Sequence, residues 1–428
     1  MRLTAANPLA HLLQAHLKPK TTAYHEIWLD KKMVAGQANN DVEPLYGPSY
    51  LPRKFKVAIA IPPMNDVDVL AHCLGYIAII EDGKLVGYNV TIGGGMGVTH
   101  GNTKTYPRLA DVLGFVTPDQ AITVGEKVML VQRDHGDRVN RKHARLKYTL
   151  EDHGMEWYRQ EVEARAGFKI AAGKPFKFES NSDRYGWVPG LNGTSIYTLF
   201  VENGRVRDRP GYKLKEGLRE IAKIHTGDFR LTANQNIIIG NVTAEKRPLI
   251  EAIMAKYNIT NERHSGLRLN SMACVALPTC GLAMAESERY LPDLIDKIDL
   301  LLQRANIRSD SIVIRMTGCP NGCARPWMAE IGFVGKAPGV YNMYLGGGFG
   351  GNRLSKIYKE GVNEAQILEA LEPIIMDYGR SRNEGEKFGD FVVRTGVVAP
   401  TLAGRLFHEV ELEKNQVATP SGTTQIYW

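Results

Sequence analysis

The spacing of apolar residues predicts strands and helices in several parts of the chain. The β-branched runs Val57–Ile61 and Ser311–Met316 each end at a turn that contains proline, Pro62-Pro63 and Gly318-Cys319-Pro320. Such runs are typical of buried strands. Apolar residues recur at helical spacing over Leu282–Arg304, so we expect a helix there. The pattern therefore predicts a fold that mixes helices and sheets.

An internal repeat gives the second organisational signal. Tyr88-Asn89 precedes Gly93-Gly94-Gly95, and Tyr341-Asn342 precedes Gly346-Gly347-Gly348, a separation of 253 residues (88 to 341). Repeats of this kind indicate a duplicated structural unit. Because each copy follows one of the strand-like runs, we predict two related α/β modules, at residues 46–175 and 251–410.

The pattern of the segment between the two modules, residues 176–250, predicts a small α+β unit. Ser195–Glu202 is expected to be a strand, and Asn203-Gly204 is a hairpin signal. Lys213–His225 has the pattern of an amphipathic helix, and Arg230–Val242 that of a strand pair. A complete duplication would place a similar unit before the first module.

The two ends of the chain are expected to differ from these modules. Only residues 1–45 precede the first module, so we expect an N-terminal piece to be missing and this region to be its remnant. Residues 411–428 are polar and contain Pro, Gly and Thr, which favours a loose or partner-docking tail.

Composition places the chain among ordinary globular proteins. It has 428 residues, of which 43% are hydrophobic and 23% charged. No apolar run approaches the roughly 18 residues of a membrane span, and the N-terminus lacks the pattern of a secretory signal. We therefore predict a cytoplasmic protein with no membrane partner. The net charge of +7 favours anionic ligands but is too diffuse to indicate nucleic acid.

Cysteine placement is the most informative part of the composition. Four of the five cysteines form two pairs, Cys274 with Cys280 and Cys319 with Cys323, on segments whose Pro and Gly favour turns. The N-terminal end of the helix expected after Cys280 would lower thiol pKa values. Four thiolates can hold a [4Fe-4S] cluster or zinc, and buried inert cysteines are a third possibility. The wide C-x5-C spacing favours the cluster, whereas Cys73 stands alone in an apolar stretch and is predicted to be structural.

The second glycine run has an alternative interpretation. Gly346, Gly348 and Gly351 satisfy G-x-G-x-x-G, which could indicate a dinucleotide site, but the sister copy breaks the pattern at Val98. We favour glycines that let the backbone bend or approach a large cofactor.

Two basic segments could face an anion. Strand alternation over Leu51–Val57 would send Lys54 and Lys56 to one face and Arg53 to the other. Two neighbouring lysines repel each other unless an anion lies between them, although a solvated strand end is the simpler alternative. In Arg141–Lys147, a helix would place Arg141 and Arg145 at i and i+4, which indicates either an anion site or a solvated basic face.

At these residues a family becomes visible. Thr317–Cys323, followed by Glu330–Phe333, resembles the signature of sirohaem-dependent sulfite and nitrite reductases, and Asn270–Cys280 is similar to its upstream half. The resemblance covers nearly all of residues 1–400. Similarity to the assimilatory sulfite-reducing branch of the family is carried by three further segments, Leu51–Lys56, Thr232–Asn236 and Gly335–Gly339.

The resemblance implies an α+β fold, with duplicated sirohaem/Fe–S α/β modules and a ferredoxin-like unit between them. It also implies six-electron reduction of sulfite to sulfide in cysteine biosynthesis. The cofactors would be sirohaem and a [4Fe-4S] cluster. The cluster would be held by Cys274, Cys280, Cys319 and Cys323, and Cys323 would also bridge to the sirohaem iron.

The resemblance further implies roles for polar residues and for partners. Lys54 and Lys56 would act on sulfite, while Arg53, Lys147, Gln235 and Asn321 would contact the sirohaem. Electrons would come from a flavoprotein reductase subunit that uses NADPH, or from ferredoxin. The rival hypotheses are a nitrite reductase of the same family and a non-catalytic iron–sulfur or zinc protein, the latter if the missing N-terminal piece abolishes the active site.

Overall fold

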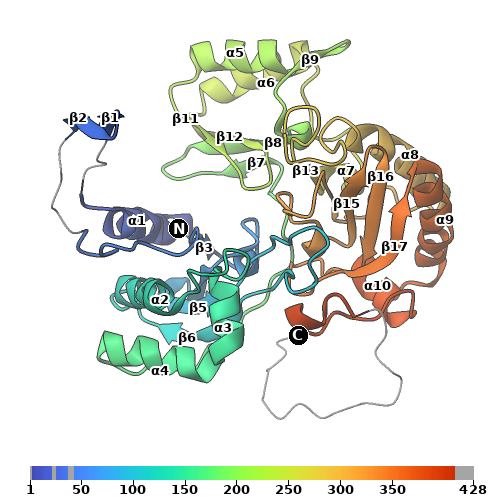
Figure 1. Ribbon diagram of the computed structural model, residues 1–428. Coiled ribbons are helices and arrows are strands. Elements are labelled where there is room, and N and C mark those ends of the chain that lie inside the picture. Colours follow the sequence, from blue (N-terminus) through green and yellow to red (C-terminus); the bar gives the residue numbers. More distant parts are fainter. Residues whose placement is uncertain (1, 22–25, 37–42, 410–428) are drawn as a thin grey trace. The chain divides into compact units, whose positions relative to one another are not determined.

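The chain divides into two units in the computed structural model, which describes residues 2–21, 26–36 and 43–409 (Figure 1). The first unit comprises Met1–Ile61, His72–Gly94 and Ala110–Lys174, and the second comprises Pro62–Ala71, Gly95–Leu109 and Pro175–Trp428. Two short segments of the first repeat copy thus belong to the second unit. The predicted tail, residues 411–428, lies outside the described residues.

A four-stranded sheet of order β3-β4-β5-β6 forms the framework of the first unit. Its strands are β3 (Val57–Ala60), β4 (Leu74–Glu81), β5 (Lys84–Ile92) and β6 (Asp111–Val116), and its helices are α1 (Arg2–Leu17), α2 (Ala121–His135), α3 (Leu146–His153) and α4 (Met155–Ala166). Leu13 of α1, Val124 of α2 and Tyr158 of α4 are buried in one core with the sheet. A separate two-stranded sheet joins β1 (Glu26–Leu29) to β2 (Lys32–Gly36).

The second unit contains a five-stranded sheet of order β13-β14-β15-β16-β17. Helices α8 and α9 pack on it and on each other, as Figure 1 shows. The elements are α7 (Gly266–Leu269), β13 (Ser271–Ala273), α8 (Leu291–Arg304), β14 (Ile314–Thr317), η3 (Pro326–Met328), β15 (Ile331–Ala337), β16 (Val340–Leu345), β17 (Lys356–Val362), α9 (Glu364–Ser381), α10 (Phe388–Arg394) and η4 (Gly404–Leu406). Strands β13, β14 and β15 run parallel, whereas β16 and β17 are antiparallel to their neighbours.

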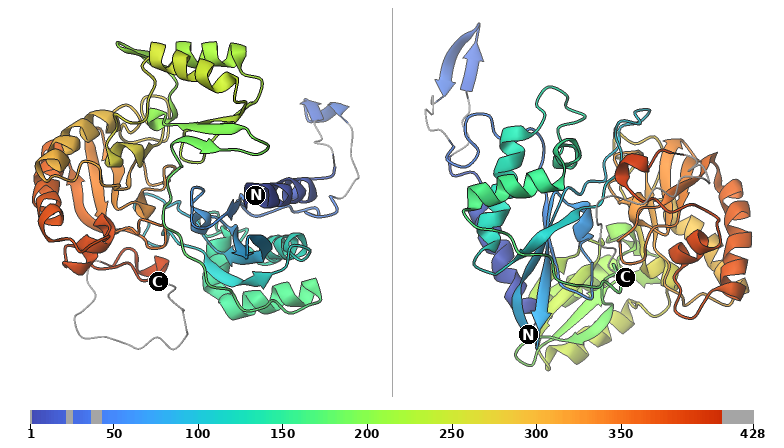
Figure 2. Two further views of the ribbon diagram at one scale, coloured as in Figure 1. Left: turned by 180° about the vertical axis from the view of Figure 1, so that it is seen from behind. Right: turned by 90° about the horizontal axis from the view of Figure 1, so that it is seen from below.

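A smaller antiparallel sheet of order β11-β12-β8-β7 also belongs to the second unit, with α5 and α6 on one of its faces (Figure 2). Its elements are β7 (Gly186–Pro189), β8 (Ser195–Leu199), α5 (Leu214–Ile224), β11 (Asp228–Leu231), β12 (Ile237–Val242) and α6 (Lys246–Lys256), and the short η2 (Glu202–Gly204), β9 (Asp208–Arg209) and β10 (Tyr212–Lys213) lie between β8 and α5. The predicted strand at 195–202, the helix at 213–225 and the strand pair at 230–242 are confirmed within a few residues.

The predicted hairpin at Asn203-Gly204 is wrong. These residues belong to the 3-10 turn η2, and β8 pairs with β7 and with the distant β12 instead of a strand directly after the turn. The Asn203 side chain donates a hydrogen bond to the Glu288 carbonyl at 2.9 Å, so this residue is used for a long-range contact.

The internal repeat corresponds to a repeated sheet topology. In both sheets a parallel pair, β3-β4 or β14-β15, is continued by two antiparallel strands. The equivalent asparagines also bind backbone: Asn89 forms two hydrogen bonds with Lys174 of the first unit, and Asn342 accepts one from Gly361 of the second. The sequence repeat therefore corresponds to two sheets whose strands follow one another in the same directions.

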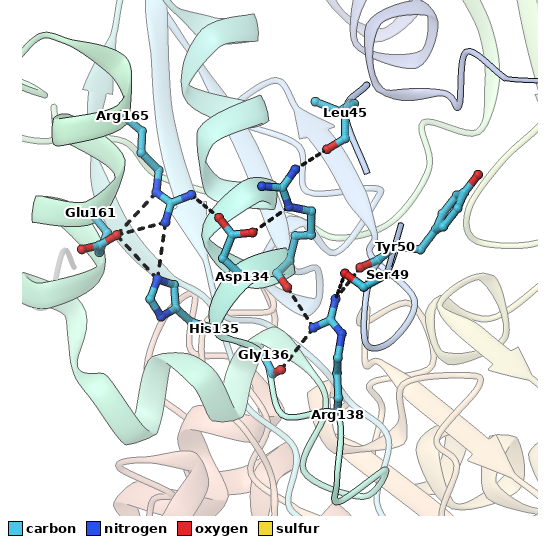
Figure 3. A network of polar contacts seen from close by, with 10 residues as sticks. Leu45, Ser49, Tyr50, Asp134, His135, Gly136, Arg138, Glu161 and Arg165 are labelled. Carbon is cyan, nitrogen blue, oxygen red and sulfur yellow. Dashed lines mark hydrogen bonds and ion pairs between the residues drawn. The ribbon is translucent and has the colours of Figure 1, made fainter. Parts of the chain in front are cut away.

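A polar network holds the segment that leads into the basic residues of the first unit (Figure 3). Arg133 donates to the Leu45 carbonyl at 2.7 Å, and Arg138 donates to Ser49 at 3.4 Å. Asp134 forms ion pairs with Arg133 and Arg165. Burial alone would raise the pKa of the Asp134 carboxyl, but the two arginines lower it below its usual value. The end of α2 thereby fixes the chain just before Arg53.

In the described part of the chain, none of the helices has both the length and the apolar character needed to cross a bilayer.

A buried carboxyl group joins the large sheet of the second unit to α10. Glu330 is fully buried and accepts hydrogen bonds from the backbone N–H groups of Val313, at 2.8 Å, and Gly389, at 2.7 Å. Burial raises the pKa of Glu330 to about 7, although these two donors favour the carboxylate. The folded state therefore binds a proton more tightly than the unfolded chain does.

This raised pKa predicts a pH dependence of stability. The contribution of Glu330 is fully present below pH 4.5 and is lost as the pH rises to about 7. The loss is on the order of 3 kcal/mol, because one pKa unit corresponds to about 1.4 kcal/mol. Urea unfolding of wild type and Glu330→Gln between pH 4.5 and 8 measures it: the unfolding free energy of wild type should fall relative to that of Glu330→Gln as the pH rises. A difference that stays constant would contradict the assignment.

Candidate functional site

The four paired cysteines lie on two loops at one edge of the five-stranded sheet. Cys274 follows the last residue of β13 directly, and Cys319 follows β14 after a single glycine. Strands β13 and β14 are parallel neighbours, so their carboxyl ends meet at the same edge. The topology therefore brings together the first cysteine of each pair.

Hydrogen bonds join the two loops around Gly318. Its N–H donates to Cys274 Sγ at 3.3 Å, and its carbonyl accepts from the N–H groups of Met284, at 2.8 Å, and Ala285, at 3.2 Å. The Thr317 hydroxyl donates to the same sulfur at 3.4 Å. Two donors of the second loop therefore point at the sulfur of a cysteine in the first loop.

The pKa of the Cys319 thiol depends on burial and on its neighbours. Burial raises the pKa of the Cys319 thiol, and Cys274 and Cys280 raise it further, while hydrogen bonds from Asn321 act in the opposite direction. Cys319 is buried, Cys274 and Cys280 are partly buried, and Cys323 is exposed. Thiolates that repel each other in this way are stabilised by bound cations such as the irons of a cluster.

The two loops together supply four cysteine side chains. In the part of the chain that the structure describes, His, Cys, Asp and Glu side chains do not converge in threes around one metal position. Four cysteine thiolates are the donor set that is usual for a [4Fe-4S] cluster.

The helix predicted over Leu282–Arg304 is shorter than expected. Helix α8 begins only at Leu291, and Pro292 occupies its first turn. The N–H groups of Met284 and Ala285 bind the Gly318 carbonyl and cannot join a helix. The prediction that a helix N-terminus follows directly on Cys280 is therefore wrong.

Two predicted cofactor residues lie beside the cysteine loops. Gln235 has a positive φ of 70° and donates to the carbonyl of Ala273, the residue before Cys274, at 2.8 Å. Its Oε1 atom is buried and has no hydrogen-bond partner among the described residues. Asn321 lies within the second loop and bonds to the Cys319 thiol. An orphaned acceptor next to Cys274 is consistent with a further ligand at this place.

The predicted substrate lysines lie in the first unit. Strand β3 begins only at Val57, so the strand predicted over Leu51–Val57 is wrong in its first part. The exposures still alternate, because Lys54 and Lys56 are exposed and Phe55 packs against the core. The two lysines are thus presented to solvent on either side of a residue that anchors the backbone.

Arginines of the same unit form a cluster that we call the arginine cluster: Arg53, Arg141 and Arg145. Burial lowers the pKa of Arg53, and the positive charges of Arg141 and Arg145 lower it further. Nη2 of Arg145 donates to Cys73 Sγ at 3.3 Å, while its Nε is buried without a partner among the described residues. Cations that repel each other and retain an unused donor indicate an anion site.

The predicted arrangement of this basic run needs one correction. Helix α3 begins at Leu146, so Arg141 and Arg145 do not share a helix face. Lys147 is 1% exposed, and its ammonium lies 4.8 Å from the centre of the Tyr148 ring. The structure therefore places Arg141 and Arg145 near Arg53, and it buries Lys147 beside Tyr148.

Two charged residues at the cysteine loops were missed by sequence reasoning. Arg325 and the fully buried Asp68 form an ion pair in the second unit. The position of Arg325, just after Cys323, is a signal that could have been used. Asp68 is 257 residues away in the sequence, and nothing local identifies it.

The dinucleotide interpretation of the second glycine run is not supported. Strand β16 is followed by a loop and then by β17, whereas a dinucleotide fingerprint opens a helix. Gly346 and Gly351 have φ values of 87° and 77°, which only glycine adopts readily.

Comparison with known proteins agrees with this geometry. The family model described as the nitrite and sulphite reductase 4Fe-4S domain matches residues 10–170 and 270–399, and that of the nitrite/sulfite reductase ferredoxin-like half domain matches 189–257. The chain belongs to the nitrite and sulfite reductase family. The predicted family is confirmed, as is the fold class of two related modules with a ferredoxin-like half-domain between them. The residue limits that we assigned to these domains stay predictions.

Several curated relatives share the name sulfite reductase [NADPH] hemoprotein beta-component. Those of Shouchella clausii, Geobacillus thermodenitrificans and Bacillus subtilis are 58%, 59% and 56% identical to the chain over 93–94% of its length, which corresponds to 70% of each relative. The solved structure of the Mycobacterium tuberculosis NirA protein has a TM-score of 0.68 at 25% identity. That match covers 81% of this chain and 64% of the NirA chain.

The loop that carries Cys319 and Cys323 predicts the effect of one substitution. Gly322 has a φ of 66°, and an added Cβ would lie 2.2 Å from the Trp327 ring. Gly322→Ala should therefore cost more than the ~1–3 kcal/mol of backbone strain alone and should displace the loop. Denaturant unfolding followed by tryptophan fluorescence measures the cost.

Gly339→Ala is the matched control. Gly339 has a φ of 70° but has no atom within 4 Å of its added Cβ, so this variant isolates the backbone strain. Equal destabilisation of the two variants would contradict the role of the Gly322–Trp327 contact.

Proposed function

We propose that this chain is the haemoprotein component of a sulfite reductase and that it reduces sulfite to sulfide by six electrons. The observation that carries the proposal is the hydrogen-bonded junction between the two loops on which the four cysteines lie. The names of the relatives support sulfite as the substrate and confirm the class of enzyme predicted from the sequence.

The four cysteines would hold the [4Fe-4S] cluster as thiolates. Cys319 would bind from the buried side of the loop and Cys323 from its exposed side, where a second cofactor could share its sulfur. Gln235 Oε1 and Asn321 would supply hydrogen bonds near this position. These residues would hold a haem-type group, which we propose is sirohaem, and its iron would supply the site for sulfite and for the transfer of electrons.

The positive residues of the first unit would bind the anionic groups. The arginine cluster fits the carboxylates of sirohaem, because Arg53 and Arg145 carry charge that the protein itself leaves poorly compensated. Arg53 would thus contact the cofactor as the sequence predicts, and we add Arg141 and Arg145 to the predicted residues. Lys147, buried beside the same run, stays a predicted cofactor residue.

Lys54 and Lys56 would act on the substrate. Reduction of sulfite to sulfide consumes six electrons and six protons and releases three water molecules. Two adjacent ammonium groups can bind the sulfite oxygens and deliver protons as each oxygen leaves as water. Because Phe55 anchors the backbone between them, both lysines can be directed at one anion.

The electrons would come from a flavoprotein partner. The relatives are named as NADPH-linked components, which favours a flavoprotein reductase over ferredoxin as the donor. The loop after β16 lacks the helix of a dinucleotide fingerprint, so it does not supply the NADPH site.

Absorbance and turnover of the anaerobically purified chain test the proposal. A Soret band and red-region absorbance, together with sulfide formation from sulfite and reduced methyl viologen, would support it. Colourless protein that contains zinc would indicate the non-catalytic alternative. Faster turnover of nitrite than of sulfite under the same donor would favour the other branch of the family.

The proposed role of Lys56 predicts that its replacement lowers sulfite turnover without changing how the cofactors are bound. Lys56→Ala should lower sulfite turnover by about 100-fold, the typical effect of losing one group that stabilises a developing charge. The visible spectrum should remain that of the wild type, since Lys56 is assigned to the substrate. Lys84→Ala removes another exposed lysine of the first unit and should leave turnover unchanged. Wild-type turnover in Lys56→Ala would refute the role.

A further inference from the structure

Arg325 links three segments of the second unit to the loop that carries Cys323. It has a left-handed backbone conformation, with φ 54° and ψ 51°, and its N–H closes a turn onto the Gly322 carbonyl. Its Nη2 lies 3.2 Å from the Ala233 carbonyl and 3.5 Å from the sulfur of Met272. Ala233 lies in the turn that presents Gln235, and Met272 belongs to β13, the strand that directly precedes Cys274.

The guanidinium of Arg325 is fixed by a buried carboxylate. Nε of Arg325 donates to Asp68 Oδ2, and Nη1 of Arg315 donates to the same oxygen at 2.7 Å. The side chains of Asp68 and Arg315 are 1% and 2% exposed. Burial alone would raise the pKa of Asp68, but the two arginines lower it below its usual value, so the carboxyl is ionised.

The three side chains carry a net charge of +1, since two guanidinium groups share one carboxylate. Arg315 lies on β14, the strand that leads into the loop of Cys319, and Arg325 follows Cys323 after one residue. Both ends of the C-x3-C loop are thus tied to one buried anion. This pairing fixes the loop and also places a positive charge beside it.

We infer that Asp68 and Arg325 are positioning residues for the cluster: through Arg325, Asp68 holds Cys323 in register with the other three cysteines, and the net charge of the triad tunes the cluster potential. The inference rests on the proposed cluster. Residues that hold metal ligands in place typically contribute 10- to 100-fold to metal affinity. The potential of an iron–sulfur cluster responds to the charge around it.

Three variants distinguish the effect of Arg325 and Asp68 on the position of the Cys323 loop from the effect of their charge on the cluster potential. Asp68→Asn raises the triad charge to +2, Arg325→Gln lowers it to 0, and Arg325→Lys retains +1 but loses the planar fork that reaches several acceptors. Arg325→Gln leaves the buried pair of Asp68 and Arg315 intact, so it should fold even if Asp68→Asn does not.

Iron and sulfide content, the rate of cluster loss to a chelator, and the midpoint potential are measured in the holoprotein of each variant. Cluster loss should accelerate about 10- to 100-fold in Arg325→Gln and in Asp68→Asn, and less in Arg325→Lys. The midpoint potential should rise in Asp68→Asn and fall in Arg325→Gln. Opposite shifts would not result from a general loosening of the fold.

Glu202→Gln is the matched control, because Glu202 pairs with Arg209 and Arg268 in the same unit. It should leave cluster loss and potential unchanged. Wild-type protein without a cluster would refute the proposed function itself. Wild-type protein with a cluster, together with unchanged loss rates and potentials in Arg325→Gln, would overturn only the role of the Asp68–Arg325 pair.

Discussion

The Gly318 carbonyl accepts hydrogen bonds from two consecutive backbone N–H groups, Met284 and Ala285, and the placement of the cysteines depends on this contact. It forces the chain after Cys280 to turn back onto the loop of Cys319 instead of starting a helix. Only glycine fits at 318, since an added Cβ would lie 2.6 Å from Ala276 and 2.7 Å from the Ala285 carbonyl. A side chain here would separate the two cysteine pairs.

The charge of the molecule is organised around the same chemistry. The chain carries a net charge of +7, and two groups of arginines have fewer acidic partners among the described residues than positive charges. In the first unit burial and the positive charges of Arg141 and Arg145 lower the pKa of Arg53. In the second unit two arginines share one buried carboxylate beside the cysteine loops. Under the proposed function, the negative charge of a thiolate-bound cluster and of a carboxylate-rich cofactor would stabilise both groups.

Sequence reasoning succeeds where a local pattern determines the structure. The repeat around Tyr88 and Tyr341 predicted two related modules, and both sheets show the same strand directions. The strand before Pro62 and the helix at 213–225 follow from their apolar spacing. The cysteine spacing predicted two turns that could converge, and β13 and β14 supply the shared edge.

Contacts between distant segments explain what the sequence could not reveal. The apolar spacing over 282–304 suits a helix, yet its first part is held by Gly318 from another loop. Asn203-Gly204 has the composition of a hairpin turn, but Asn203 binds the Glu288 carbonyl. The run 141–147 alone could not show that Arg141 and Arg145 act on Arg53, because Arg53 is far away in the sequence.

The most direct test of the account is the iron and sulfide content of five single variants, each with one cysteine replaced by serine. We predict four irons and four sulfides per chain in wild type and in Cys73→Ser, because Cys73 is buried in the core of the first unit. Cys274→Ser, Cys280→Ser, Cys319→Ser and Cys323→Ser should each lose the intact cluster. A full cluster in any of these four, or its loss in Cys73→Ser alone, would contradict the assignment of the two loops as the cluster site.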